Sequence, residues 1–100
     1  MNLAIRTLCQ ASTGTLSSEG VEALQASGGQ LVDIRSPADF RRDAMSGAVN
    51  LPVDALSHDF GQLDKQEPVI LYGNSENVMC SRAARLLAGK GFRRIYHFSE

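Results

Sequence analysis

The sequence predicts an α/β domain whose mostly parallel central sheet has about four to five strands, with helices on both faces. Three observations support this fold class. Short apolar runs alternate along the chain with stretches in which apolar residues have helical spacing. The links between these segments are short, and no internal repeat interrupts the pattern. With 100 residues and 43% hydrophobic content, the chain has enough apolar material for one core only.

Charge and cysteine content exclude several classes of partner. The ten basic and eleven acidic residues give a net charge of −1, so we expect neither nucleic acid nor a membrane as a partner. The apolar start, residues 1–9, contains Arg6 and is too short for a signal peptide or a membrane span. We therefore expect a cytoplasmic protein in which Cys9 and Cys80 are free thiols. No cysteine or histidine pair has metal-ligand spacing, which predicts no metal and no cofactor.

The first helix is predicted near the start of the domain. Residues 1–15 give little signal and are expected to form an N-terminal arm or edge segment, ahead of a domain over residues 16–100. Ser17 can cap a helix, and Glu19 suits the positive end of its dipole. The Ser-Gly-Gly run 27–29 should end this helix, which we expect to cover one face of the sheet.

The other elements follow from turn residues and apolar spacing. In order, they are a strand over residues 30–35, a short helix from 36 to 40, a brief strand within 45–52, a helix carrying Leu56, Phe60 and Leu63, a strand over 69–72, a helix beginning at Cys80 and a strand over 94–98. Ser36 and Asp39 frame a capping box with proline at the first helical position. The run 69–72 combines β-branched, aliphatic and aromatic residues, which favours the middle of the sheet.

The segment from Pro68 to Leu87 is where we expect any reactive centre. It has the pattern of a buried strand, a polar loop and a helix, in which backbone N–H groups at the helix start converge on an anion or a nucleophile. The centre should lie between Gly73 and Cys80. The predicted binding loop comprises Gly73, Asn74, Ser75, Glu76, Asn77, Val78 and Met79.

Several segments together resemble the rhodanese-like (sulfurtransferase) family. They are residues 31–40 (Leu-Val-Asp-Ile-Arg-Ser-Pro-Ala-Asp-Phe), 46–52 (Ser-Gly-Ala-Val-Asn-Leu-Pro), 69–72, 82–87 and 91–92, in an order and spacing that are specific. The resemblance implies a rhodanese-like fold over residues 16–98. Asp33 and Arg35 match the acidic and basic pair that the family places at the end of its second strand, where we expect a structural ion pair.

The resemblance also implies persulfide transfer. In the family, a cysteine directly after the strand's tyrosine takes a sulfane sulfur from a donor such as thiosulfate and passes it to a thiophilic acceptor. Loop amides and an arginine at the end of the loop hold the anion and lower the pKa of the thiol. In this sequence Gly73 occupies the position of the cysteine and Met79 that of the arginine. Asp43-Ala44 replaces a Gly-His pair further upstream, and Glu76 adds a negative charge to the loop.

Two functions remain open from the sequence. The first is a catalytically inactive binding or regulatory module whose partner is a protein or a small anionic or sulfur-containing ligand. The alternative is a thiosulfate sulfurtransferase-type persulfide carrier or redox-sensing thiol that uses Cys80, with a pKa lowered by the helix start and by Arg82 or Arg85. The spacing of Cys80 from Leu87 favours burial, and its separation from Gly73 by seven positions favours the inactive module.

The end of the chain supports a third expectation. Members of the family usually continue past the last strand with a glycine-rich turn and another helix, and the sequence stops at Glu100. A third hypothesis is therefore that the chain is a portion of a longer protein.

Overall fold

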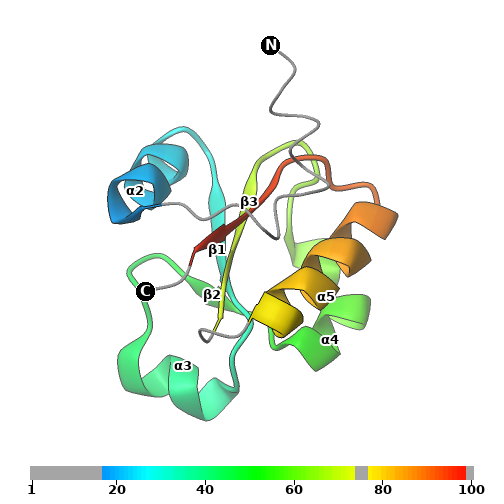
Figure 1. Ribbon diagram of the computed structural model, residues 1–100, viewed down its shortest axis with the longest axis horizontal. Coiled ribbons are helices and arrows are strands. Elements are labelled where there is room, and N and C mark those ends of the chain that lie inside the picture. The colour runs from blue at the N-terminus through cyan, green and yellow to red at the C-terminus, as the bar shows by residue number, and fades with distance from the viewer. Residues whose placement is uncertain (1–16, 74–76, 99–100) are drawn as a thin grey trace.

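Four parallel strands form the central sheet, in the order β2-β1-β3-β4 (Figure 1). The computed structural model describes residues 17–73 and 77–98, so the predicted arm over residues 1–15 and the thiol of Cys9 lie outside the described residues. The strands are β1 (Gln30–Asp33), β2 (Val49–Asn50), β3 (Val69–Tyr72) and β4 (Ile95–Phe98). The predicted parallel sheet is confirmed, and β3 lies in its interior as expected.

Helices cover both faces of this sheet, which confirms the predicted architecture. They are α2 (Ser18–Ala26), α3 (Pro37–Asp43), α4 (Val53–Asp59), the 3₁₀-helix η2 (Phe60–Gln62) and α5 (Asn77–Gly89). Helix α2 lies on one side of the sheet, and α4 and α5 lie on the other (Figure 1). No helix in the described ranges has the length and apolar character needed to cross a bilayer.

Two apolar clusters separate along the two faces of the sheet. On the α2 face, Val21 packs with Leu31, Ile70, Tyr72 and Phe98. The larger cluster on the opposite face includes Val32, Ile34, Leu56, Leu71, Cys80, Ala83, Ala84, Leu87 and Ile95. Every residue of β3 is buried, which explains its unbroken apolar run, because a strand covered on both faces has no solvent side.

Local side-chain bonds explain where the first two helices begin. The Ser17 hydroxyl accepts a hydrogen bond from the backbone N–H of Gly20 at 3.1 Å, and that of Ser36 accepts one from Asp39 at 3.2 Å. Each bond satisfies a backbone donor that has no partner inside the helix. The sequence therefore determined both helix starts through contacts within one turn.

Helix α3 is longer than predicted, because it continues past Phe40 to Asp43. Arg42 forms an ion pair with Asp39 at 2.7 Å across one turn, and basic residues in the last turn suit the negative end of the helix dipole. These two contributions favour the extra turn.

Strand β1 is shorter than predicted, because it ends at Asp33 rather than Arg35. The carboxylate of Asp33 accepts a hydrogen bond from the backbone N–H of Arg35 at 2.9 Å. This bond draws the backbone away from the sheet, although Ile34 still donates to the Tyr72 carbonyl at 3.0 Å. The chain therefore leaves the sheet at the carboxyl end of β1.

His97 in β4 is buried, and neither ring nitrogen has a hydrogen-bond partner within residues 17–73 and 77–98. Burial lowers the pKa of His97. As the pH falls below the ordinary histidine pKa of about 6.5, the ring of His97 becomes protonated in the unfolded chain but stays neutral in the folded chain. We therefore expect the free energy of unfolding to fall by up to about 1.4 kcal/mol per pH unit in that window. Urea unfolding at several pH values measures this slope.

Matched variants assign the slope to one histidine. His97→Leu should remove this part of the pH dependence, whereas His58→Gln should leave it unchanged, since His58 is exposed. An unaltered slope in His97→Leu would show that the buried ring does not control acid stability.

Candidate functional site

The candidate site lies at the carboxyl ends of β1 and β3, where the chain passes from Tyr72 through Gly73 toward α5. In open parallel sheets, ligands bind beyond these strand ends. Gly73 is buried. Asn74, Ser75 and Glu76 of the predicted binding loop lie outside the described residues.

The last part of the predicted binding loop is helical. Helix α5 begins at Asn77, three residues before the expected start at Cys80, so Asn77, Val78 and Met79 form its first turn. The helix was predicted from apolar spacing, which begins only where one face of α5 meets the core. The first turn of α5 comes before that face, so the spacing did not reveal it. Met79 is 37% exposed and lies at the rim of the site.

Gly73 and Cys80 are neighbours in space. A Cβ placed on Gly73 would lie 3.2 Å from the Sγ of Cys80 and 3.3 Å from Cγ1 and Cδ1 of Ile34. The separation of Gly73 and Cys80 by seven positions in the sequence therefore did not predict their short distance in space, because α5 packs back against β3. Ordinary carbon contacts are longer, so any side chain at position 73 requires its neighbours to move. A side chain at this position would therefore require Cys80 or Ile34 to shift by a few tenths of an ångström.

The thiol of Cys80 is fully buried, and it is a free thiol. Desolvation by burial raises the pKa of Cys80 to about 11, so the sulfur is protonated at neutral pH. Arg82 and Arg85 are both exposed. The expected lowering of the Cys80 pKa by the helix start and by these arginines is therefore wrong. Cys80 is the fourth residue of α5, where the effect of the dipole has weakened.

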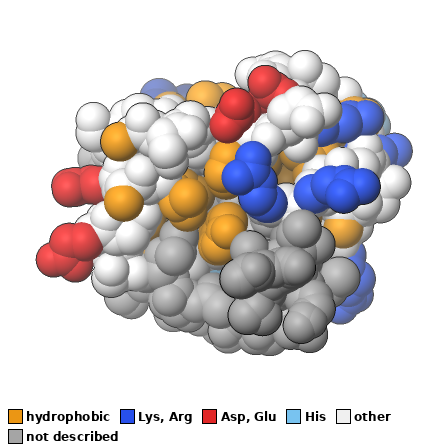
Figure 2. Space-filling view, turned by 90° about the horizontal axis from the view of Figure 1, so that it is seen from above, with side chains coloured by type: hydrophobic (Ala, Val, Ile, Leu, Met, Phe, Trp, Pro, Cys, Tyr) orange, Lys and Arg blue, Asp and Glu red, His pale blue; other side chains and the backbone are white. Residues whose placement is uncertain are grey.

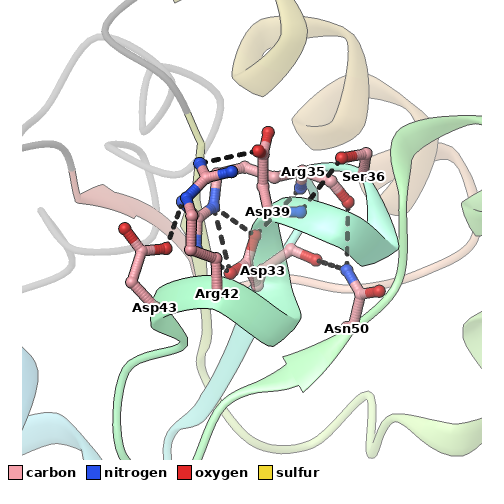
Figure 3. A network of polar contacts seen from close by, with 7 residues as sticks. All are labelled: Asp33, Arg35, Ser36, Asp39, Arg42, Asp43 and Asn50. Carbon is pink, nitrogen blue, oxygen red and sulfur yellow. Dashed lines mark hydrogen bonds and ion pairs between the residues drawn. The ribbon is translucent and has the colours of Figure 1, made fainter.

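A buried ion pair fixes the end of β1 (Figure 3). The Nη2 of Arg35 lies 2.8 Å from Oδ2 of Asp33, and its Nε donates to Oδ1 at 3.0 Å. This is the pair expected from the sequence. Hydrogen bonding to Asp33 raises the pKa of Arg35 above its ordinary value. The guanidinium also lies 4.9 Å from the centroid of the Tyr72 ring.

Asp43 is a member of this network that sequence reasoning missed. Its Oδ1 accepts from Nη1 of Arg35 at 3.0 Å, so the guanidinium contacts two carboxylates (Figure 3). The only signal in the sequence was the replacement of the family's Gly-His pair by Asp43-Ala44. Asn50 completes the arrangement by donating to the carbonyls of Asp33 and Arg35 at 2.9 and 3.0 Å. Arg35 is thus held by anions of the chain itself.

A cleft of about 240 Å³ lies beside this strand end. It is lined by Ile34, Val53 and Met79, by two prolines, and by Ser36 and Asp54. Among the described residues that line it, Asp54 is the only ionisable one, and none is a lysine or an arginine. A larger depression of about 640 Å³ lies between α2 and residues 45–47, away from Gly73 and Cys80.

Several basic residues lie at the opposite end of the sheet. Lys65 precedes β3 and Arg94 precedes β4, so both lie beyond the amino ends of these parallel strands. The Nζ of Lys90 lies 5.1 Å from the centroid of the Phe60 ring, and that of Lys65 lies 6.0 Å from it. Figure 2 shows lysine and arginine side chains gathered on one half of this end of the molecule. These cations are therefore separated from the cleft by the length of the strands.

Comparison with known proteins identifies the family. The model of the rhodanese-like domain matches residues 17–100. A tRNA sulfurtransferase of Desulfurococcus amylolyticus is 36% identical over 63 residues, which are 63% of this chain and 12% of that protein. A thiosulfate sulfurtransferase, GlpE, of Shewanella oneidensis is 32% identical over 76 residues, which are 76% of this chain and 74% of that protein. The chain thus spans a small part of the first relative and most of the second.

Solved structures agree on the fold. The crystal structure of a full-length protein from Lactobacillus plantarum superposes with a TM-score of 0.74 at 23% sequence identity, over 94% of this chain and 82% of that chain. The family model and the parallel sheet point to the same assignment. This chain belongs to the rhodanese-like domain family.

Proposed function

We propose that this domain is a catalytically inactive member of the family that acts as a binding or regulatory module. One observation carries the proposal: position 73 is a glycine whose Cβ position is packed by the sulfur of Cys80 and the side chain of Ile34. A glycine offers no atom that can carry sulfur. Close packing by Cys80 and Ile34 around this position therefore supports the proposal.

The groups around this position agree with the proposal. Met79, which stands where the resemblance places the arginine, offers neither charge nor a hydrogen-bond donor to an anion. Arg35, which follows the end of β1, has its guanidinium bound by Asp33 and Asp43. Among the described residues that line the cleft at this strand end, none is a lysine or an arginine that could hold thiosulfate.

The thiosulfate:cyanide sulfurtransferase assay tests the proposal. We expect the purified chain to give no rate above the uncatalysed background, and Cys80→Ala to behave in the same way. A robust rate that Cys80→Ala abolishes would overturn the proposal. The sulfurtransferase names of the relatives make this assay the necessary first measurement.

A second candidate function rests on the position of the Cys80 sulfur. Because Sγ lies 3.2 Å from the Cβ position of Gly73, the thiol approaches the family's reactive position from the helix side. In this alternative, Cys80 carries a persulfide or senses oxidants after a local opening exposes it. Mass spectrometry after incubation with thiosulfate or polysulfide distinguishes the two candidates. A sulfur adduct on Cys80, in a chain carrying Cys9→Ser, supports the carrier, and an unmodified Cys80 excludes it.

A further inference from the structure

We propose that the cleft beside Met79 binds a protein segment that inserts one aliphatic side chain and places a lysine or arginine next to Asp54. This inference rests on the proposed function, because it names the partner class of the inactive site. It also departs from the anionic ligand that the resemblance implies. Three features of the cleft carry it: its lining, its charge and its size.

The lining is apolar on three sides. Ile34 comes from the end of β1, Val53 from the first turn of α4, and Met79 from the first turn of α5. Met79 is 37% exposed, although most large apolar side chains of the described residues are buried. A flexible thioether at the rim of a cleft can adapt to the shape of an incoming side chain. An aliphatic group placed here would remove this exposed surface from water.

The charge of the cleft favours a cation. Asp54 is exposed, and no ion pair joins it to any residue in the part of the chain that the structure describes. The other polar lining residue, Ser36, is neutral, and its hydroxyl caps α3. An anion in this cleft would meet a carboxylate with no compensating base, whereas a lysine or arginine would form an ion pair with it.

The size of the cleft favours a side chain of a protein over a separate small molecule. Sites for small molecules usually enclose about 300–1,000 Å³. This cleft, at about 240 Å³, falls below that range but has room for one aliphatic side chain. A single anchor residue in a pocket with a charged neighbour at its rim is a common arrangement at protein interfaces.

A pair of peptides that differ in one charge tests the inference. The probes are acetyl-Leu-Lys-amide and acetyl-Leu-Glu-amide, each titrated into the isotope-labelled full chain and followed by backbone amide chemical shifts. We expect the lysine peptide to shift the amides of Ile34, Val53 and Met79 and to bind about fivefold more tightly than the glutamate peptide, because one exposed charge pair changes sign. Thiosulfate should leave these amides unshifted.

Two variants locate the effect. Asp54→Asn should bring the two peptides to equal affinity, whereas Asp59→Asn, which removes an exposed acid from the other end of the same helix, should preserve the preference. Tighter binding of the glutamate peptide, shifts caused by thiosulfate, or no shift at the cleft with either peptide would each overturn the inference. None of these readouts depends on sulfur transfer. The thiosulfate:cyanide assay therefore tests the proposed inactivity independently of peptide binding at the cleft.

Discussion

Replacing Arg35 by methionine should lower the free energy of unfolding by about 3–5 kcal/mol, because the variant leaves a buried carboxylate without its cation. Asp33 has no exposed surface, and Arg35 supplies its charged hydrogen bonds. Methionine keeps much of the apolar stem of Arg35, so the loss reports mainly on the guanidinium and its charge. Urea denaturation followed by circular dichroism measures it.

Two controls separate the buried pair from the exposed contact. The side chain of Asp43 is 60% exposed, so Asp43→Asn should destabilise the domain far less than Arg35→Met. The double variant Asp33→Asn/Arg35→Met removes both charges and should recover part of the loss, since no unpaired ion remains in the core. A loss in Arg35→Met no greater than that in Asp43→Asn would show that the pair does not stabilise this strand end.

Replacing Gly73 by cysteine should produce a disulfide with Cys80 rather than a free nucleophile. In a disulfide, the Cβ of one half lies about 3.0 Å from the partner sulfur, as bond lengths and angles require. The Cβ position of Gly73 lies 3.2 Å from Sγ of Cys80, which is close to that geometry. On oxidation, the two thiols lose two protons and two electrons to an added oxidant such as diamide, and one S–S bond forms.

Mass spectrometry and thiol labelling measure this outcome. Oxidised Gly73→Cys should lose the mass of two hydrogen atoms and resist alkylation at both positions, in a background that carries Cys9→Ser. The double variant Gly73→Cys/Cys80→Ala should remain open to alkylation, because no partner sulfur is present. Two alkylated thiols in the oxidised single variant would contradict the close approach of β3 and α5.

The contrast between the two variants bears on the proposed inactivity of the domain. A cysteine at position 73 would meet both Ile34 and Cys80, and overpacking of this kind commonly destabilises a core by about 1–3 kcal/mol. Under the proposed function, we therefore expect that Gly73→Cys alone does not produce sulfurtransferase activity. The neighbours must move as well, and Met79 would still lack the charge that holds an anion.

Local sequence chemistry predicted most of the fold. The helix starts at Ser17 and Ser36 depend on a side chain and a backbone donor within one turn, so neighbouring residues alone determine them. The interior position of β3 followed from its apolar run, because only a strand covered on both faces lacks a polar side. The ion pair of Asp33 and Arg35 also joins near neighbours in the chain.

Contacts between segments that are distant in the sequence could not be predicted from it. The bond between Asp43 and Arg35 depends on the turn that α3 makes after β1, and the first turn of α5 precedes the apolar spacing from which that helix was predicted. The high pKa of Cys80 comes from burial against β3, which no spacing along one helix reveals.

The sequence by itself determined the fold class, the strand that leads to the site and the absence of a cysteine at Gly73, because each is a property of a residue type or of neighbours along the chain. Only the tertiary structure decided that Cys80 and Ile34 pack against the Cβ position of Gly73. It also placed Asp54 and Met79 in one cleft. These contacts join residues from different strands and helices. They form only when the crossover helices pack onto the parallel sheet, so they depend on the tertiary structure.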